Sequence, residues 1–542
     1  MCHDYYPDFC VGKADMSEQE LKLHVPAAAV GGVRQEIAGR QATRLPLRAM
    51  YFDTPERELV KARIALRLRQ EGDTWVQTVK MPGANAISRI ELNHLRPGPV
   101  LDLSVYAGTE VGEALSRLQG QLGVRYETDV QRLLCKLRAR EGTVEAALDL
   151  GVLRAGGLEL PICEIEFELL SGRPQAIFSI ARGWQKRHGL VLDSRSKSER
   201  GDALAQLAAE LGLAGDEAAA RQIVARFWAP RGSVGISLDA GMTPEQAMSR
   251  VAGECLEQII RNAAMLAEVD TAGVYAAGGP EHVHQLRVGM RRLRSAWRLF
   301  EGAIEAPPAP LQSGIREYFG ALGASRDQDV LADTIVPALI QAGMPDIPVE
   351  PVVRGADAHA LCSGAAFQGW LLDLYEWSLN VRPASADRTA PALADGQPFE
   401  PAIIPLDAAP PKATLLPFLT RRLRKWHKQV VSQGMHFGDL ELAARHELRK
   451  RAKRLRYGLS FAESLLPGAR LRGYRKQLAE VQDLLGEIND LAVAADHYRA
   501  QTLNHPQAWF ALGWIAARLQ TLATQAQPAF ARLAKGKGFW KA

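Results

Sequence analysis

Two short stretches carry the residues whose types and spacing could do chemistry. Residues 18–22 read Glu-Gln-Glu-Leu-Lys, and residues 164–168 read Glu-Ile-Glu-Phe-Glu. Charged residues at every second position predict two β-strands, each with its charges on one face. A strand with carboxylates on one face and apolar residues on the other is unusual if the acidic face meets water, and it makes sense if that face lines the inside of a closed barrel. Clustered carboxylates repel one another unless a cation lies among them, and Mg²⁺ and Mn²⁺ favour such oxygen ligands. We therefore predict a metal site inside a β-barrel.

Further alternating segments continue to about residue 208, and they add basic residues to the same predicted face. For any single strand, the alternative is an antiparallel sheet with a solvated charged side. The same bias in strand after strand favours a shared interior. Convergent arginine and lysine side chains bind phosphate oxygens through charge-assisted hydrogen bonds. The pattern predicts a site for a metal-bound polyanion, with these bases: Lys22, Arg67, Arg69, Lys80, Arg89, Arg132 and Lys197.

The length and composition of the chain set broad limits. A chain of 542 residues is too long for one core, which predicts at least two domains. It has no apolar run long enough for a transmembrane helix, and the six cysteines lack metal-ligand spacing. We expect a cytoplasmic protein with reduced thiols. Residues 1–15 lack the pattern of a signal peptide and are predicted to be a loose tail.

The acidic and basic blocks together carry a family resemblance. The glutamate-rich stretch at 18–22 is followed by Tyr-Phe-Asp-Thr at 51–54, Leu-Arg-Leu-Arg at 66–69, Lys80, Asp149, the second stretch at 164–168 and Ser-Lys at 196–197, in that order. This set resembles the CYTH domain, also called the triphosphate tunnel metalloenzyme family, over about residues 16–208. The resemblance implies an eight-stranded antiparallel β-barrel with flanking helices, in which a triphosphate binds within the tunnel.

The resemblance also implies a role for each residue of the set. The implied metal ligands for Mg²⁺ or Mn²⁺ are Glu18, Glu20, Glu166 and Glu168, and the implied catalytic carboxylates are Asp149, Glu164, Glu166 and Glu168. The seven bases named above would grip the phosphates, with Arg89 matching less sharply. Arg195 stands where a lysine would not be surprising, and its role stays open.

From about Thr243 the pattern of the sequence changes to helical. Thr-Pro-Glu-Gln at 243–246 is typical of a helix start, and strand-like alternation then disappears. We predict a domain at 16–211, a linker at 212–242 and an all-helical domain at 243–535. Within the helical part we expect repeats at about 243–380 and 414–535, separated by a Pro/Ala-rich insertion at 382–413. Residues 536–542 form a predicted basic tail.

The helical half contains an internal repeat of basic residues. His-x-x-Arg at 284–287 followed by Arg-Arg-Leu-Arg at 291–294 recurs as His-x-x-Arg at 446–449 followed by Lys-Arg-Leu-Arg at 453–456. Each copy precedes a second motif, at 322–327 and 485–490. A solvated helix face is the simpler explanation of one stripe, whereas two copies favour a surface for a polyanion. The candidate residues are His284, Arg287, Arg291, Arg294, His446, Arg449, Lys453, Arg454 and Arg456.

This doubled pattern resembles the CHAD domain over about residues 243–535. The resemblance implies two four-helix-bundle repeats around a basic channel that binds inorganic polyphosphate. Lys453 replaces an arginine of the pattern, and Val288 stands where the second copy has Lys450.

Several functions are compatible with these motifs. The leading hypothesis is a metal-dependent inorganic triphosphatase whose helical half binds polyphosphate. The main alternative is a polyphosphate-binding or granule-targeting protein with an idle or regulatory barrel. Adenylate cyclase, thiamine triphosphatase and RNA triphosphatase chemistry also occur among CYTH domains, so the motifs leave them open. Specific nucleic-acid binding is disfavoured because the basic helices lack interleaved aromatic residues. We expect no membrane partner, and the motifs indicate no protein partner.

Overall fold

The computed structural model describes residues 17–83, 85–270, 278–323, 331–345, 357–384, 414–536 and 538. The predicted tail at 1–15 lies outside these residues. So do the end of the motif at 322–327, nearly all of the predicted insertion at 382–413 and most of the predicted basic tail at 536–542. Two compact units make up the chain. The first holds the chain up to Arg231 with Ile260–His282 and Ala358–Leu379, and the second holds the remaining segments.

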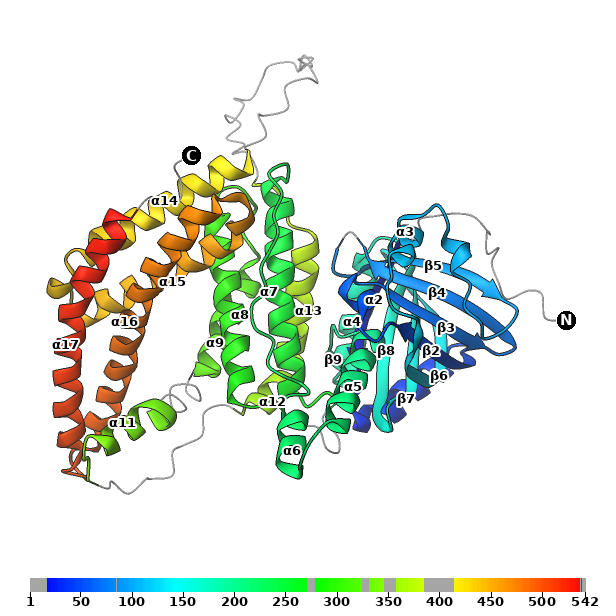
Figure 1. The fold of residues 1–542 in the computed structure, drawn as a ribbon, viewed down its shortest axis with the longest axis horizontal. Helices are drawn as coiled ribbons and strands as arrows, with labels where there is room; N and C mark the ends of the chain where they lie inside the picture. Colours follow the sequence, from blue (N-terminus) through cyan, green and yellow to red (C-terminus); the bar gives the residue numbers. More distant parts are fainter. Residues whose placement is uncertain are drawn as a thin grey trace, which may run out of the picture. The chain divides into compact units, whose positions relative to one another are not determined.

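The first unit is built on a closed antiparallel barrel of eight strands (Figure 1). The strands follow the order β5-β4-β3-β2-β6-β7-β8-β1, and pairing of β5 with β1 closes the barrel. The two-residue strand β9 (Val191–Leu192) adds to β1. The strands are β1 (Ser17–His24), β2 (Thr43–Asp53), β3 (Ala65–Glu71), β4 (Thr74–Pro82), β5 (Ser88–Arg96), β6 (Gly123–Ala139), β7 (Gly142–Ala155) and β8 (Leu158–Gly172). The predicted eight-stranded barrel is therefore confirmed.

The register of the strands separates a charged interior from an apolar exterior. Lys22 lies opposite Glu166, and their neighbours Leu21 and Phe167 pair on the other face, where both are buried. Helix α4 (Gln175–His188) covers that exterior face, with Trp184 packed edge-on against Phe167. Helices α1 (Val30–Ala38), α2 (Glu58–Lys61) and α3 (Glu110–Ser116) cover further parts of the outside. Burial of these apolar outer residues leaves the interior face free to carry charge.

One end of the barrel interior is filled by an apolar cluster. Tyr51 and Tyr126 stack there with ring centroids 4.6 Å apart, and Val130 and Leu153 belong to the same cluster. Helix α5 (Lys197–Gly212) adds Leu204, Ala205 and Leu207, and α6 (Glu217–Ala225) packs behind it. Gly201 lets α5 approach closely, because a Cβ there would stand 2.2 Å from the Tyr126 ring. The charged part of the tunnel is thus closed at this end.

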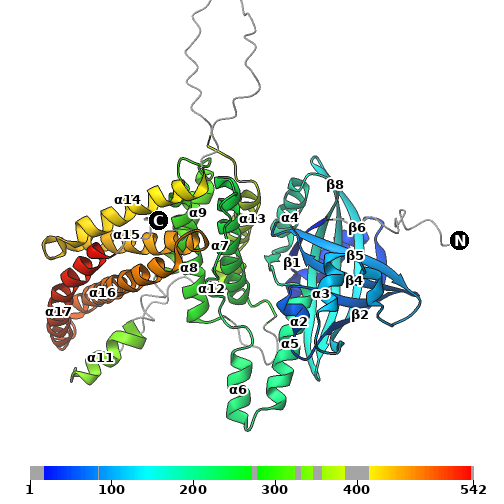
Figure 2. The same ribbon diagram turned by 45° about the horizontal axis from the view of Figure 1, so that its top comes forward.

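The rest of the described chain is mainly helical, as predicted. Its longer helices are α7 (Pro244–Leu266), α8 (Pro280–Leu299), α9 (Ala309–Ala321), α13 (Ala365–Leu379), α14 (Leu415–Gly434), α15 (Leu442–Phe461), α16 (Gly468–Gln501) and α17 (Ala508–Lys535), with shorter α11 (Val336–Gln341) and α12 (Ala358–Ser363). In the second unit, α14 packs on α15 and α17, and α16 packs on the same two helices, which completes a four-helix bundle (Figure 2). No described helix is long and apolar enough to cross a membrane.

Candidate functional site: a charged tunnel and a basic helical surface

The acidic side chains of the tunnel lie in two levels set by the strand register. At the first level, Glu20 of β1 lies opposite Glu168 of β8, which lies opposite Glu145 of β7. Directly opposed residues of antiparallel strands bring their Cβ atoms to about 5 Å. At the second level, Glu164 of β8 lies opposite Asp149 of β7. The barrel therefore brings together carboxylates from distant parts of the sequence.

The first level carries more negative charge than its basic neighbours offset. Burial raises the pKa of Glu18 to about 9, and nearby Glu91 and Glu168 add to the effect. Burial likewise raises the pKa of Glu168 to about 7; Lys80 opposes this shift, and Glu145 and Glu20 add to it. The ion pairs at this level are long, with the Lys80 Nζ 3.7 Å from a Glu18 oxygen and the Arg89 Nε 3.8 Å from a Glu20 oxygen.

The second level is also compact, but its charge is balanced. Oxygens of Asp149, Glu164 and Glu166 lie within 4.8 Å of one another. The Lys197 Nζ sits 2.6 Å from Asp149, 2.5 Å from Glu164 and 2.8 Å from Glu166. Arg132 donates two hydrogen bonds of 2.7 Å to Asp149 and one of 2.6 Å to Glu166. Burial alone would raise the pKa of Glu166, yet Lys197 and Arg132 hold it well below its usual range.

The remaining predicted bases line the same tunnel. Arg67 bonds to Glu91 at 3.2 Å, and the Lys80 Nζ lies 2.5 Å from a second Glu91 oxygen. The Lys22 Nζ lies 3.3 Å from Glu164, and Arg69 pairs with Glu71. All seven predicted phosphate-binding bases therefore project from the strands or from α5 into one enclosed space.

The floor of the charged region contains a buried ion-pair network that the sequence pattern did not reveal. Arg200 of α5 donates to a Glu164 oxygen at 2.5 Å and to both Asp270 oxygens at 3.0 and 3.1 Å. Asp270 follows α7 and has a left-handed backbone with φ of 58°. Arg195, whose role the sequence left open, pairs with Asp193 at 2.9 Å and lies over the Trp228 ring. Arg195 is therefore a buried member of this network.

The basic stripe of α8 is observed, but only part of it is surface. Arg287 donates to the Phe319 carbonyl of α9 at 2.8 Å and lies 4.2 Å from that ring centre. Arg291 and Arg294 lie at 5.8 and 5.9 Å from the same ring. His284 is half-buried on α8. Arg292, the second residue of the Arg-Arg-Leu-Arg run, is fully buried and donates to Gln258 at 2.7 Å. Phe319 therefore acts as an aromatic platform that the repeat pattern did not indicate.

The second stripe, on α15, contacts the second partner motif. The His446 Nδ1 lies 2.9 Å from the Asn489 Oδ1 of α16, and Arg449 lies 3.7 Å from Asp490. The exposed Arg456 lies on the same helix, one turn beyond half-buried Lys453. For the first copy, the corresponding acidic residues fall outside the described part of the chain.

The two stripes converge at Lys453. Burial lowers the pKa of Lys453 to about 7, and Arg291 of α8 adds to this effect, followed by Arg449 and Arg456 of α15. Asp490 of α16 opposes it. Beside burial, repulsion from these three arginines favours the neutral form of Lys453. The surface formed by these residues therefore has a strong electrostatic preference for an anion.

Comparisons with known proteins identify both regions. Residues 16–201 match the family model of the CYTH domain, and residues 250–499 match that of the CHAD domain. This chain contains a CYTH domain followed by a CHAD domain. The CYTH region is also 32% identical over 158 residues to the inorganic triphosphatase of Haemophilus influenzae, a match that spans 28% of this chain and 44% of the relative. The chain thus covers less than half the length of that enzyme.

Two further proteins are similar to larger parts of this chain. An uncharacterised protein of Mycobacterium tuberculosis is 25% identical over 519 residues, which cover 90% of this chain and 89% of the relative. The crystal structure of the CHAD domain from the plant Ricinus communis is 28% identical, with a TM-score of 0.42 over 56% of this chain and 96% of the plant chain.

The carboxylates of the CYTH tunnel fit a hard divalent cation. The second level is compact, but Lys197 and Arg132 already balance its charge. The first level offers Glu18, Glu20 and Glu168, and burial, together with neighbouring carboxylates, raises the pKa of Glu18 and of Glu168. Carboxylate oxygens of this kind are the preferred ligands of Mg²⁺ and Mn²⁺. The donor chemistry of the tunnel therefore suits a divalent cation.

Proposed function

We propose that the CYTH tunnel hydrolyses inorganic triphosphate in a metal-dependent reaction. The observation that carries this proposal is the enclosed space in which an acidic level adjoins seven basic side chains. Membership of the CYTH domain and the likeness to a triphosphatase support the same reaction. Glu18, Glu20 and Glu168 of the first level, with Glu166, are the proposed ligands of Mg²⁺ or Mn²⁺. Such an ion, when bound, neutralises phosphate charge and makes water a better nucleophile.

The chain's own residues would orient and stabilise the phosphate chain. Lys22, Arg132 and Lys197 lie at the second carboxylate level, and Arg67, Arg69, Lys80 and Arg89 come from β3, β4 and β5 on the same interior face. Preorganised cations stabilise the charge that develops as a phosphoanhydride bond breaks. Asp149, Glu164 and Glu166 hold Lys197 and Arg132 in place before substrate enters. The apolar cluster at the far end favours a short chain held within the tunnel.

The proposed triphosphatase reaction is tested by phosphate release with Mg²⁺ and with Mn²⁺. Glu166→Ala removes a proposed ligand and a partner of both Lys197 and Arg132, so we expect at least about a 100-fold loss in kcat/KM. Glu159→Gln is the matched control, because Glu159 lies on the same strand but pairs with Arg154 at an exposed site. Unchanged phosphate release by Glu166→Ala would refute the assigned site. The panel includes ATP and thiamine triphosphate, so that a preference for either would redirect the proposal to another CYTH reaction.

We further propose that the CHAD surface binds inorganic polyphosphate. The convergence of Arg291 and Lys453 from the two repeats, with the depressed pKa of Lys453, supports this role. Retention of the chain on a polyphosphate resin should fall sharply in the double variant Arg291→Ala and Arg454→Ala. Retention equal to that of the unmodified chain would count against it. If the resin retains the chain while no triphosphate is hydrolysed, the protein is a polyphosphate-binding or granule-targeting protein instead. The proposed place of action is the cytoplasm.

A further inference from the structure

The charged side chains at the floor of the tunnel form a closed ring in which the sign of the charge alternates. They come from β1, β8, the segment after β9, helix α5 and the turn after α7. Each member contacts the next, so a shift of one is transmitted to both neighbours. Around the ring the pairs are Lys22–Asp193 at 3.7 Å, Asp193–Arg195 at 2.9 Å, Arg195–Asp270 at 3.4 Å, Asp270–Arg200 at 3.0 Å, Arg200–Glu164 at 2.5 Å and Glu164–Lys22 at 3.3 Å.

The ring contains one of the predicted phosphate-binding bases, Lys22. Within the described residues, its carboxylate partners are Glu164 and Asp193. Asp193 is buried, and although burial alone would raise its pKa, Arg195 and Lys22 hold that pKa well below its usual range. A buried charge is costly unless it is paired, so the Lys22 ammonium follows these two carboxylates. The place of Asp193 therefore affects where the Lys22 Nζ meets a substrate.

Asp193 directly follows β9, the shortest described strand of the sheet. β9 contains two residues and pairs on one side with the end of β1. On its other side, the Leu192 N–H donates to the Gln368 Oε1 at 2.9 Å. The Gln368 Nε2 donates in turn to the Cys362 carbonyl at 2.6 Å, so both ends of this buried amide are bonded. Gln368 thus takes the place of a neighbouring strand at this edge of the sheet.

Gln368 lies within the CHAD domain of the sequence, yet it belongs to the same compact unit as the tunnel. Its helix, α13, packs on α4 (Figure 2), with Tyr375 edge-on against Phe178. The end of α7 reaches β9 as well, because Val191 packs in an apolar cluster with residues of α7 and of the turn after it. Two segments of the helical region therefore support β9 and the start of the charged ring.

We propose that Gln368 is a positioning residue for the tunnel reaction: it fixes β9, and so holds Asp193 where it aligns Lys22. This inference rests on the proposed triphosphate tunnel. Gln368 itself touches no substrate and acts through one hydrogen bond, one peptide unit and one ion pair. Without its amide, the buried Leu192 N–H would lose its acceptor, which disfavours the observed place of β9. Lys22 would then keep Glu164 but lose Asp193.

The test is calorimetric titration of the full chain with diimidotriphosphate and Mg²⁺, together with phosphate release from triphosphate. Gln368→Met removes the amide at nearly constant length. Gln368→Glu is the conservative rescue, because a protonated carboxyl group can accept from Leu192 and donate to Cys362. Gln185→Met is the matched control: Gln185 is a buried amide of the same α4–α13 contact, but it donates to the Ala365 carbonyl at 3.3 Å. Any binding outside the tunnel is common to these chains and cancels.

Gln368→Met should bind the analogue about 3- to 10-fold more weakly and raise the KM for triphosphate by a similar factor, with a smaller change in kcat. Gln368→Glu should restore most of the affinity, and Gln185→Met should equal the wild type. In a chain that already carries Lys22→Met, Gln368→Met should change the affinity by less than about 2-fold, because the side chain through which it acts is absent. A merely structural role would not depend on Lys22 in this way.

Equal affinity in the wild type and Gln368→Met would overturn this role. The same loss in Gln185→Met, or an undiminished loss in the Lys22→Met chain, would overturn it too. If Gln368→Met does not fold, Gln368→Asn, which withdraws the amide by one methylene, replaces it in every comparison. A wild type that binds the analogue but releases no phosphate overturns the triphosphatase reaction alone, because the binding comparisons need no hydrolysis. A wild type that does not bind the analogue overturns both proposals.

Discussion

Asp270→Asn tests whether a residue outside the CYTH barrel sequence positions the tunnel bases. Asp270 is 5% exposed and pairs with Arg200, which is 1% exposed and also bonds to Glu164. Removing one partner of a buried ion pair costs about 3–5 kcal/mol. Here Arg200 keeps Glu164, and asparagine keeps one acceptor oxygen and tolerates the left-handed backbone. We therefore expect a smaller loss of about 2–3 kcal/mol.

The same substitution should alter substrate binding more than the chemical step. Without Asp270, Arg200 pairs more strongly with Glu164, whose carboxylate also forms ion pairs with Lys197 and Lys22. The KM for triphosphate should rise several-fold, with a smaller change in kcat. At about 2–4 °C per kcal/mol for a unit of this size, the first thermal transition should fall by about 4–12 °C. Thermal unfolding and steady-state phosphate release measure the two effects.

Asp373→Asn provides the control for this prediction. Asp373 lies on α13 in the same unit and pairs with Arg182 at 3.1 Å, but its side chain is 51% exposed. An exposed pair contributes about 0–1 kcal/mol, so the control should resemble the wild type. If Asp270→Asn also resembles the wild type in both thermal transition and KM, the positioning role of the buried network is refuted.

Three further predictions concern other parts of the molecule. Gly201→Ala should destabilise the first unit by about 1–3 kcal/mol and lower triphosphatase activity, because the added methyl would push α5 away from Tyr126. A thermal transition equal to that of the wild type would refute this close packing. Polyphosphate affinity should fall as pH rises through about 7, because Lys453 then loses its charge, and Lys453→Ala should lose part of that dependence in a resin-binding series. The apparent affinity for Mn²⁺ should rise between about pH 6 and 9, because protons must leave Glu168 and Glu18 before a metal binds. A Mn²⁺ affinity that does not change over this pH range would contradict the proposed first-level ligands.

The sequence predicted which residues face the tunnel, because alternation along a strand determines the face of every side chain. Glu18, Lys22, Arg67 and Glu166 were placed correctly in the interior without knowledge of the register. The change of period at about Thr243 likewise predicted the helical region. These are properties that a short stretch of sequence carries by itself.

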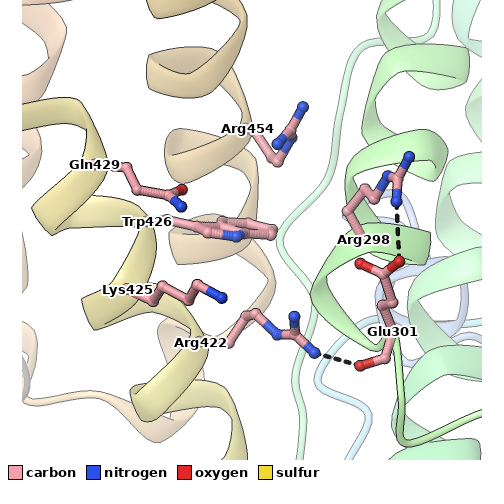
Figure 3. Close-up of a pocket in the computed structure, with 7 residues that line it drawn as sticks. All are labelled: Arg298, Glu301, Arg422, Lys425, Trp426, Gln429 and Arg454. Carbon is pink, nitrogen blue, oxygen red and sulfur yellow. Dashed lines mark hydrogen bonds and ion pairs between the residues drawn. The ribbon is translucent and has the colours of Figure 1, made fainter. Parts of the chain in front are cut away.

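The pairing of charges could not be predicted in this way, because it depends on contacts between distant segments. Arg200 is one turn from Lys197, but its partner Asp270 lies 70 residues further along the chain. Arg292 belongs to a basic run and is nevertheless buried against Gln258. Arg454 lines a cavity of about 230 Å³ together with Lys425, which lies on α14, a helix outside the repeat motif (Figure 3). Helical and strand periodicity give a direction for each side chain, but not the neighbour that meets it.

The most direct test of the proposed metal–triphosphate tunnel is an anomalous diffraction map from crystals soaked with Mn²⁺ and a non-hydrolysable triphosphate analogue. We predict an anomalous peak bound by Glu20 and Glu168, with the analogue extending toward Arg132 and Lys197. A peak held only by the second-level cluster of Asp149, Glu164 and Glu166 would contradict the charge argument. If the analogue binds outside the barrel and the barrel holds no Mn²⁺, the proposed metal–triphosphate tunnel is wrong.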